Sequence, residues 1–129
     1  MVSLSIAEGT GDLKGTISLN AIDGVVSFSG LNVDLIGENK SIIAEADGLS
    51  PAISGTFSII AAEASRLVVY TGDQQVAQVG EAVDIAPAVR IQDLFGNPIS
   101  NLSVSFAVTS GGGSIAPTTA VVTDTDGIA

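Results

Sequence analysis

The sequence predicts an all-β protein, and three observations indicate this fold class. β-Branched residues, which favour strands, are common, and Gly, Asn, Asp and Ser, which favour turns, recur between them. Apolar and polar residues alternate with a period of two in many short runs, and no segment has a convincing helical period. Short strands that follow one another at roughly 8–12 residue spacing are typical of a sandwich or a barrel.

The alternation is clearest near the two ends of the chain. VSLSI begins at Val2 and VSFAV begins at Val104, and each places apolar side chains at every second position. Further expected strands cover 16–20, 24–29, 41–46, 54–60, 66–70, 83–85 and 89–91 on either side of Pro87, and 119–123. Between them stand the turn signals AEGTGD, DG, GENK, ADG, TGDQ, FGNP and SGGGS.

Composition and charge exclude several classes of protein. Four basic residues stand against fourteen acidic ones, and a formal net charge of -10 repels phosphate backbones, so we expect no nucleic-acid partner. No apolar run approaches the roughly 20 residues that span a bilayer, so we expect no membrane insertion. The chain has no Cys and no His, which excludes disulfides, thiolate metal sites and the usual proton shuttle at neutral pH.

QDLFGNPISNLSVSFAV, residues 92–108, contains a strong hairpin signal. Asp93 can accept hydrogen bonds from amides in the turn, Gly96 can take a positive φ, and Pro98 fixes φ where the next strand begins. Asn97 completes this D-x-x-G-N-P motif. Phe95 at the tip either packs over the end of the domain or contacts a neighbour or ligand.

The two ends of the chain align with each other. Residues 2–26 match residues 104–129 with a single one-residue gap, and Val2 falls on Val104. The other matches are Ile6 on Val108, Gly9 on Gly111, Gly11 on Gly113, Leu13 on Ile115, Thr16 on Thr118, and Asp23-Gly24 on Asp126-Gly127. A chance match in a chain rich in Ser, Thr, Gly and Val is the alternative. A period of about 102 residues makes 1–62 the C-terminal portion of one repeat and 63–129 the N-terminal portion of the next.

The segment from PAVRIQDLFGNPIS to VVTDTDGIA resembles bacterial immunoglobulin-like domains of the invasin and intimin type. GVVSFSGLNVDLIGENKSIIAEADGL is similar to the downstream half of such repeats in large bacterial surface proteins. The resemblance implies an immunoglobulin-like β-sandwich with Greek-key antiparallel sheets, located outside the cell or on its surface. It identifies a fold family more specifically than a function.

Two loops are candidates for ion or phosphate binding. Asp124 and Asp126 in DTDG, and more loosely Asp23 and Asp12, can offer carboxylate oxygens to Ca²⁺, but an Asx turn before a strand explains the same residues. SGGGS at 110–114 lacks the Lys and Ser or Thr that complete a phosphate-binding loop, and we interpret GENKS at 37–41 as a turn. No cofactor is therefore expected, and Ca²⁺ stays the weaker alternative.

An enzyme is not expected. Without His a Ser-His-Asp triad cannot exist, and a Ser-Lys pair would rest on Lys14 or Lys40, both in polar, turn-like contexts. Carboxylate pairs that cleave sugars usually come with aromatic platforms, and this chain has no Trp and one Tyr.

Two function classes follow from these expectations. In the first, the chain is a spacer repeat that presents a distal domain away from a bacterial surface, with neighbouring immunoglobulin-like repeats as partners. In the second, it is an adhesive module that recognises a carbohydrate or protein through Phe95, Asn97 and Asn101. We also expect self-association by strand exchange, with segments 2–26 and 104–129 competing for the same place.

Overall fold

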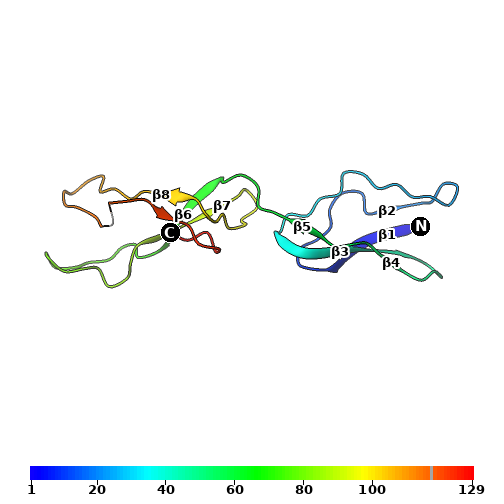
Figure 1. Cartoon of the computed structure of the whole chain (residues 1–129), viewed down its shortest axis with the longest axis horizontal. Coiled ribbons are helices and arrows are strands. Elements are labelled where there is room, and N and C mark those ends of the chain that lie inside the picture. Colours follow the sequence, from blue (N-terminus) through cyan, green and yellow to red (C-terminus); the bar gives the residue numbers. More distant parts are fainter. Residues whose placement is uncertain (117) are drawn as a thin grey trace. The chain divides into compact units, whose positions relative to one another are not determined.

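The computed structural model describes residues 1–116 and 118–129. Within this part of the chain every strand pair is antiparallel and there is no helix, so the protein is all-β. The chain divides into two compact units, Met1–Ala61 (unit 1) and Ala62–Ala129 (unit 2), whose strands Figure 1 labels. Position 117 belongs to the second aligned segment, 104–129, and lies outside the described residues.

Unit 1 is a five-stranded antiparallel sheet. Its strands are β1 (Val2–Glu8), β2 (Ser18–Leu19), β3 (Gly37–Ala46), β4 (Ala52–Ile53) and β5 (Phe57–Ile59). The order is β2-β1-β3-β4, and β5 also pairs with β3. Strands β1 and β3 form the long pair of this sheet (Figure 1). Their register places Val2 opposite Ala46 and Ile6 opposite Ile42. This pair forms the centre of unit 1.

The sequence interpretation of GENKS as a turn is wrong, because these residues begin β3. The backbone does bulge here: Asn39 has a φ of 54°, and the pairing with β5 shifts between Gly37 and Lys40. The strand persists because Lys40 is fully buried, and its Nζ donates a hydrogen bond to the carbonyl oxygen of Thr10. A long apolar stem with a satisfied ammonium group thus replaces an apolar core side chain.

Unit 2 contains two short antiparallel ladders. Its strands are β6 (Arg66–Thr71), β7 (Ala88–Gln92), β8 (Ser103–Val104) and β9 (Val121–Val122). β6 pairs with β7, and β8 pairs with β9. On the other edge of β7, Val89 and Ala129 exchange two backbone hydrogen bonds of 3.0 Å, and the Ile91 amide donates to Gly127 at 2.8 Å. The end of the chain is therefore fixed against β7.

Two expected strands do not form. Ile22 and Val25 close a two-residue turn through Asp23 and Gly24, both with positive φ, and no strand follows it over 24–29. Residues 83–85 also lack a strand, because the side chain of Gln75 takes the place of a strand partner there. Its amide nitrogen donates to the Ile85 carbonyl at 2.7 Å, and its amide oxygen accepts from the Ile85 amide at 2.8 Å.

The two aligned segments form strand pairs in the same register. In unit 1, Val2 of β1 lies opposite Leu19 of β2. In unit 2, Val104 of β8 lies opposite Val121 of β9, and both positions are 102 residues further along the chain. The glycines in the intervening loops also correspond, since Gly9, Gly11, Gly111 and Gly113 all have positive φ.

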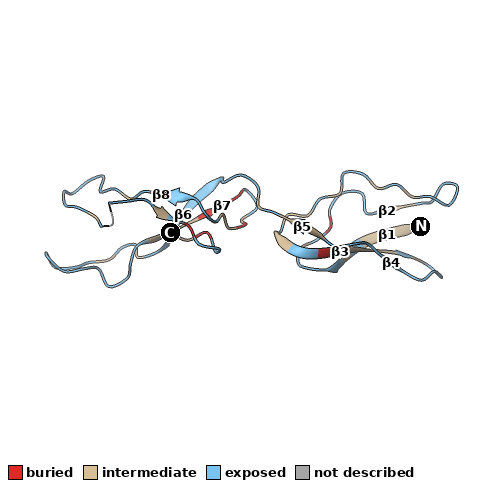
Figure 2. Ribbon diagram, in the orientation of Figure 1, coloured by how far each residue is buried: buried red, intermediate tan, exposed pale blue. Residues whose placement is uncertain are grey.

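Few side chains are buried in either unit (Figure 2). Among the described residues, the buried apolar side chains are Leu13, Ile91 and Val104. The fully buried side chains are polar: Lys40 in unit 1 and Asp93 in unit 2. All six residues of β6 are exposed, including Leu67 and Val69. Each unit therefore exposes much apolar surface and depends strongly on its buried polar contacts.

Candidate functional site

The hairpin around Asp93 is the most tightly organised part of unit 2. The Asp93 amide donates to the Asn97 carbonyl at 2.9 Å, and the Gly96 amide donates back to the Asp93 carbonyl at 3.2 Å. The three-residue loop between them ends on Gly96, whose φ of 91° favours glycine. The D-x-x-G-N segment thus forms a hairpin loop with a left-handed last residue.

The Asp93 carboxylate accepts four hydrogen bonds and is 0% exposed. Oδ1 accepts from the backbone amides of Phe95 at 2.9 Å and Asn97 at 2.8 Å. Oδ2 accepts from the Asn97 side-chain amide at 2.9 Å and from the Ala62 backbone amide at 3.1 Å. Burial by itself raises the pKa of the Asp93 carboxyl, but the hydrogen bonds from Asn97, Ala62 and Phe95 outweigh it and hold the pKa below its usual range.

The bond to Ala62 gives Asp93 a role that sequence reasoning missed. Ala62 is the first residue of unit 2 and lies 31 positions before Asp93. The Ser65 amide donates to the Gln92 carbonyl at 2.9 Å, so a second bond holds the same connecting segment. We call the contact between Asp93 and Ala62 the Asp93 clamp. It fixes the segment through which the chain enters unit 2.

The other residues of the motif have separate structural roles. Asn97 is 5% exposed and bonded to Asp93, so its side chain supports the turn and is not presented to a ligand. Pro98 forms an isolated bridge opposite Gln92. Phe95 is 54% exposed beside the exposed Leu94. The tip of the hairpin is therefore an apolar pair on a rigid base.

DTDG forms a second hairpin with the same local chemistry. Asp124 Oδ1 accepts from the amides of Asp126 and Ile128, each at 2.9 Å, which repeats the spacing seen at Asp93. Gly127 has a φ of 74°, and a Cβ there would lie 2.5 Å from the Ile91 carbonyl oxygen. Unlike Asp93, Asp124 is exposed. This is the Asx-turn geometry considered for these residues.

The Asp124 carboxylate and the Asp126 backbone are engaged in contacts within the protein. Asp126 contributes its backbone carbonyl to the Nε of Arg90 at 2.8 Å. Among the described residues, no group of three or more acidic side chains is close enough together to hold a metal ion. Of the other two Asp candidates, Asp23 lies in the turn of unit 1 and Asp12 is exposed.

Both lysines form polar contacts within unit 1. The Lys14 ammonium forms an ion pair with Asp34, and this hydrogen bond and charge raise the pKa of Lys14. The Lys40 ammonium donates a hydrogen bond to the Thr10 carbonyl.

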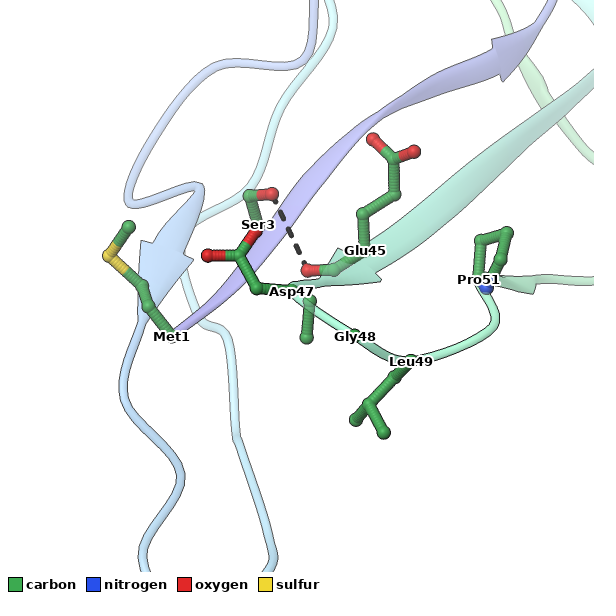
Figure 3. Close-up of a pocket in the computed structure, with 8 residues that line it drawn as sticks. Met1, Ser3, Glu45, Asp47, Gly48, Leu49 and Pro51 are labelled. Atoms are coloured by element: carbon green, nitrogen blue, oxygen red, sulfur yellow. Dashed lines mark hydrogen bonds between the residues drawn. The ribbon is translucent and has the colours of Figure 1, made fainter.

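A hollow of about 430 Å³ in unit 1, shown in Figure 3, is lined by Ser3, Glu45 and Asp47. There the Ser3 hydroxyl donates to the Glu45 backbone carbonyl at 3.5 Å.

Comparison with known proteins identifies no relative: no family model, no curated protein and no solved structure matches the chain. Within the described residues, no helix is long and apolar enough to cross a membrane.

Proposed function

We propose that the chain is a non-enzymatic spacer: an immunoglobulin-like, Greek-key β-sandwich repeat of a bacterial cell-surface or secreted adhesin-like protein. Its partners are neighbouring repeats, and its task is to hold a distal domain away from the cell. The matching register of the 2–26 and 104–129 segments, at an offset of 102 residues, supports a repeated module. The acidic surface keeps neighbouring arrays soluble and apart.

The Asp93 clamp is the observation that carries this proposal. A spacer transmits tension along the chain, and this tension reaches unit 2 through Ala62. Ala62 donates to the buried Asp93 carboxylate. The segment through which load enters unit 2 is thus tied directly to the hairpin. This arrangement suits a mechanical role.

A second candidate function rests on the exposed tip of the hairpin. Leu94 and Phe95 expose an apolar pair that an adhesive module could insert into a protein or stack on a sugar. Asn101, which is also exposed, has a φ of 60° and can add a polar contact. Asn97, by contrast, is engaged with Asp93. The double variant Leu94→Ser with Phe95→Ser separates this function from the spacer role.

Single-molecule pulling between the two ends of the chain tests the spacer proposal. The wild-type chain should resist with a distinct force peak for unit 2, because several hydrogen bonds must break together. Asp93→Ala should lower that force, whereas Asp124→Ala, which removes the exposed carboxylate of the other hairpin, should leave it nearly unchanged. Extension without a force peak, or equal effects of the two variants, would contradict the mechanical role. Capture of a glycan or protein that is lost in the Leu94, Phe95 variant would favour the adhesive function.

A further inference from the structure

Strand β8 ends at Val104, and in the described part of the chain only Val104 of the segment 104–108 is paired, on one of its two sides. Leu102 accepts a hydrogen bond from Thr123, and Val104 lies opposite Val121, so both face β9. Backbone groups alternate between the two edges of a strand, so in a strand that continued β8 the backbone groups of Ser105 and Ala107 would face the other side. Among the described residues, no backbone hydrogen bond reaches either of them. We call this the 104–108 edge.

An apolar hollow of about 580 Å³ lies beside the 104–108 edge within unit 2. Phe106 and Val108 line it together with Ile115 and Val121. Apolar side chains that line a hollow lack the van der Waals contacts that they would make in a packed core. An additional strand could therefore form backbone hydrogen bonds with the open edge and pack its apolar side chains over the hollow.

Unit 1 contains the same segment with its second edge occupied. There β1 corresponds to 104–108, and β3 pairs with it, placing Ala44 opposite Leu4 and Ile42 opposite Ile6. The strand β3 and the residues before it also cover the glycine loop. A Cβ on Gly9 would lie 2.7 Å from Lys40 Cγ, and a Cβ on Gly11 would lie 3.2 Å from Leu35 Cβ.

The corresponding loop of unit 2 is uncovered. Gly111 and Gly113 match Gly9 and Gly11 in the alignment and have the same sign of φ. A Cβ built on either of them would meet no atom of the described residues within 4 Å. The space that Lys40 and Leu35 fill in unit 1 is therefore open in unit 2, next to an open edge and an open apolar hollow.

We propose that the 104–108 edge is the docking site for β3 of a second copy of this chain. The register follows from unit 1: Val104 lies opposite Ala46 of the second copy, Phe106 opposite Ala44, and Val108 opposite Ile42. This places Ile42 and Ala44 over the apolar hollow and Lys40 against the Gly111–Gly113 loop. The inference rests on the repeat alignment that the proposed function also uses, and it concerns association with a second copy, which the pulling experiment does not test.

The docking is an exchange, because β3 must leave β1 of its own copy. The two pairings have similar sequences, and the edge of β1 opens as the 104–108 edge closes, so the exchange has little energetic bias. Two copies that exchange β3 reciprocally form a closed dimer. Each copy has a net charge of -10, so added salt should strengthen the association by screening repulsion.

Sedimentation velocity across a concentration series tests the site through a matched pair of glycines. Gly111→Ala and Gly112→Ala both place a Cβ on a residue with positive φ and nothing within 4 Å, so they strain an isolated chain similarly. In the docked state a Cβ at 111 meets the Lys40 stem, as it would at Gly9. The equivalent position in unit 1 is Thr10, whose side chain leaves room for β3, so at 112 we expect only the backbone strain that both variants share.

We expect the wild-type chain, refolded at high concentration, to form dimers that Gly111→Ala weakens by at least about tenfold and Gly112→Ala by no more than about twofold. A monomer at every concentration would overturn the proposal. Equal weakening by the two variants would also overturn it, because the association would then not involve a lysine seated at position 111.

Disulfide trapping tests the register directly, because the native chain contains no cysteine. One chain carries Ser105→Cys, and a second carries Glu45→Cys, the position that the register places opposite it. The control partner carries Ala44→Cys, which faces the other side of β3. After co-refolding and mild oxidation, mixed dimers should form with the Glu45 variant and much less with the Ala44 variant. Equal yields, or no mixed dimers, would contradict the proposed register.

Discussion

Replacing Asp93 with alanine should destabilise unit 2 more than any other single substitution in its loops. The carboxylate accepts from four donors, and two of them belong to the buried Asn97. The amides of Phe95 and Ala62 lie on exposed residues and can regain water. Each buried donor left without a partner costs about 1–3 kcal/mol, so for the two donors of Asn97 we expect a loss of about 2–6 kcal/mol.

Asp124→Ala provides the matched control. The Asp124 carboxylate accepts two amides in the same spacing but is exposed, and loss of such a local cap costs about 1 kcal/mol. For a domain of this size 1 kcal/mol shifts the melting temperature by about 4–8 °C, so the Asp93 variant should melt at least about 8 °C below the wild type.

Tyrosine fluorescence can follow this unfolding in unit 2 alone. Tyr70 is the one tyrosine of a chain without tryptophan, and it lies in β6 with the Arg90 guanidinium 5.9 Å from its ring centre. Urea titrations read at this residue give the free energy of unfolding for each variant. If Asp93→Ala shifts the midpoint no more than Asp124→Ala does, the clamp contributes nothing beyond an ordinary turn and the reasoning is refuted.

Three further predictions concern pH, ions and the buried lysine. Because the pKa of Asp93 is lowered in the folded state, the ionised carboxylate stabilises the fold above about pH 4, and this stabilisation is lost as the pH falls through the folded pKa. The difference in melting temperature between the wild type and Asp93→Asn should therefore narrow on acidification. A constant difference would contradict this. Millimolar Ca²⁺ should not shift the melting temperature more than Mg²⁺ does, since Asp124 already serves backbone amides; a shift specific to Ca²⁺ would indicate a metal site. Lys40→Ala should lower the free energy of unfolding of unit 1 by about 2 kcal/mol, because it removes a buried side-chain stem and the hydrogen bond to Thr10. Lys14→Ala, at the exposed ion pair, should have little effect. Equal effects of the two variants in unfolding followed by circular dichroism would contradict the buried role of Lys40.

The all-β class was predictable because it depends on short-range patterns. Period-two alternation and β-branched residues indicated strands at 66–70, 41–46 and 89–91, and the structure places β6, β3 and β7 there. The expected strand at 24–29 failed because alternation gives no information about whether a partner edge is available. The GENKS interpretation failed because turn-forming residues were weighed without the burial of Lys40 against a loop 30 positions away.

The candidate site shows the same limit. The residues of the hairpin motif were recognisable because Asp, Gly and Pro have local conformational preferences. The bond from Ala62 to Asp93 was not predictable, since its donor is a backbone amide of an ordinary residue 31 positions away. The role of Asn97 was misjudged for a related reason: an asparagine in a loop can face a ligand or its own turn, and only its burial decides which.

A chain that joins two copies of residues 2–103 head to tail tests the central claim, that 2–26 and 104–129 are equivalent pieces of one repeat. In this chain Val2 of the second copy takes the place of Val104, so unit 2 of the first copy is followed directly by the β3 that its open edge lacks. We predict that the two-copy chain unfolds at a higher temperature and more cooperatively than one copy of 2–103, because a complete module forms inside it. The same melting temperature and the same breadth of transition for one and two copies would contradict the claim.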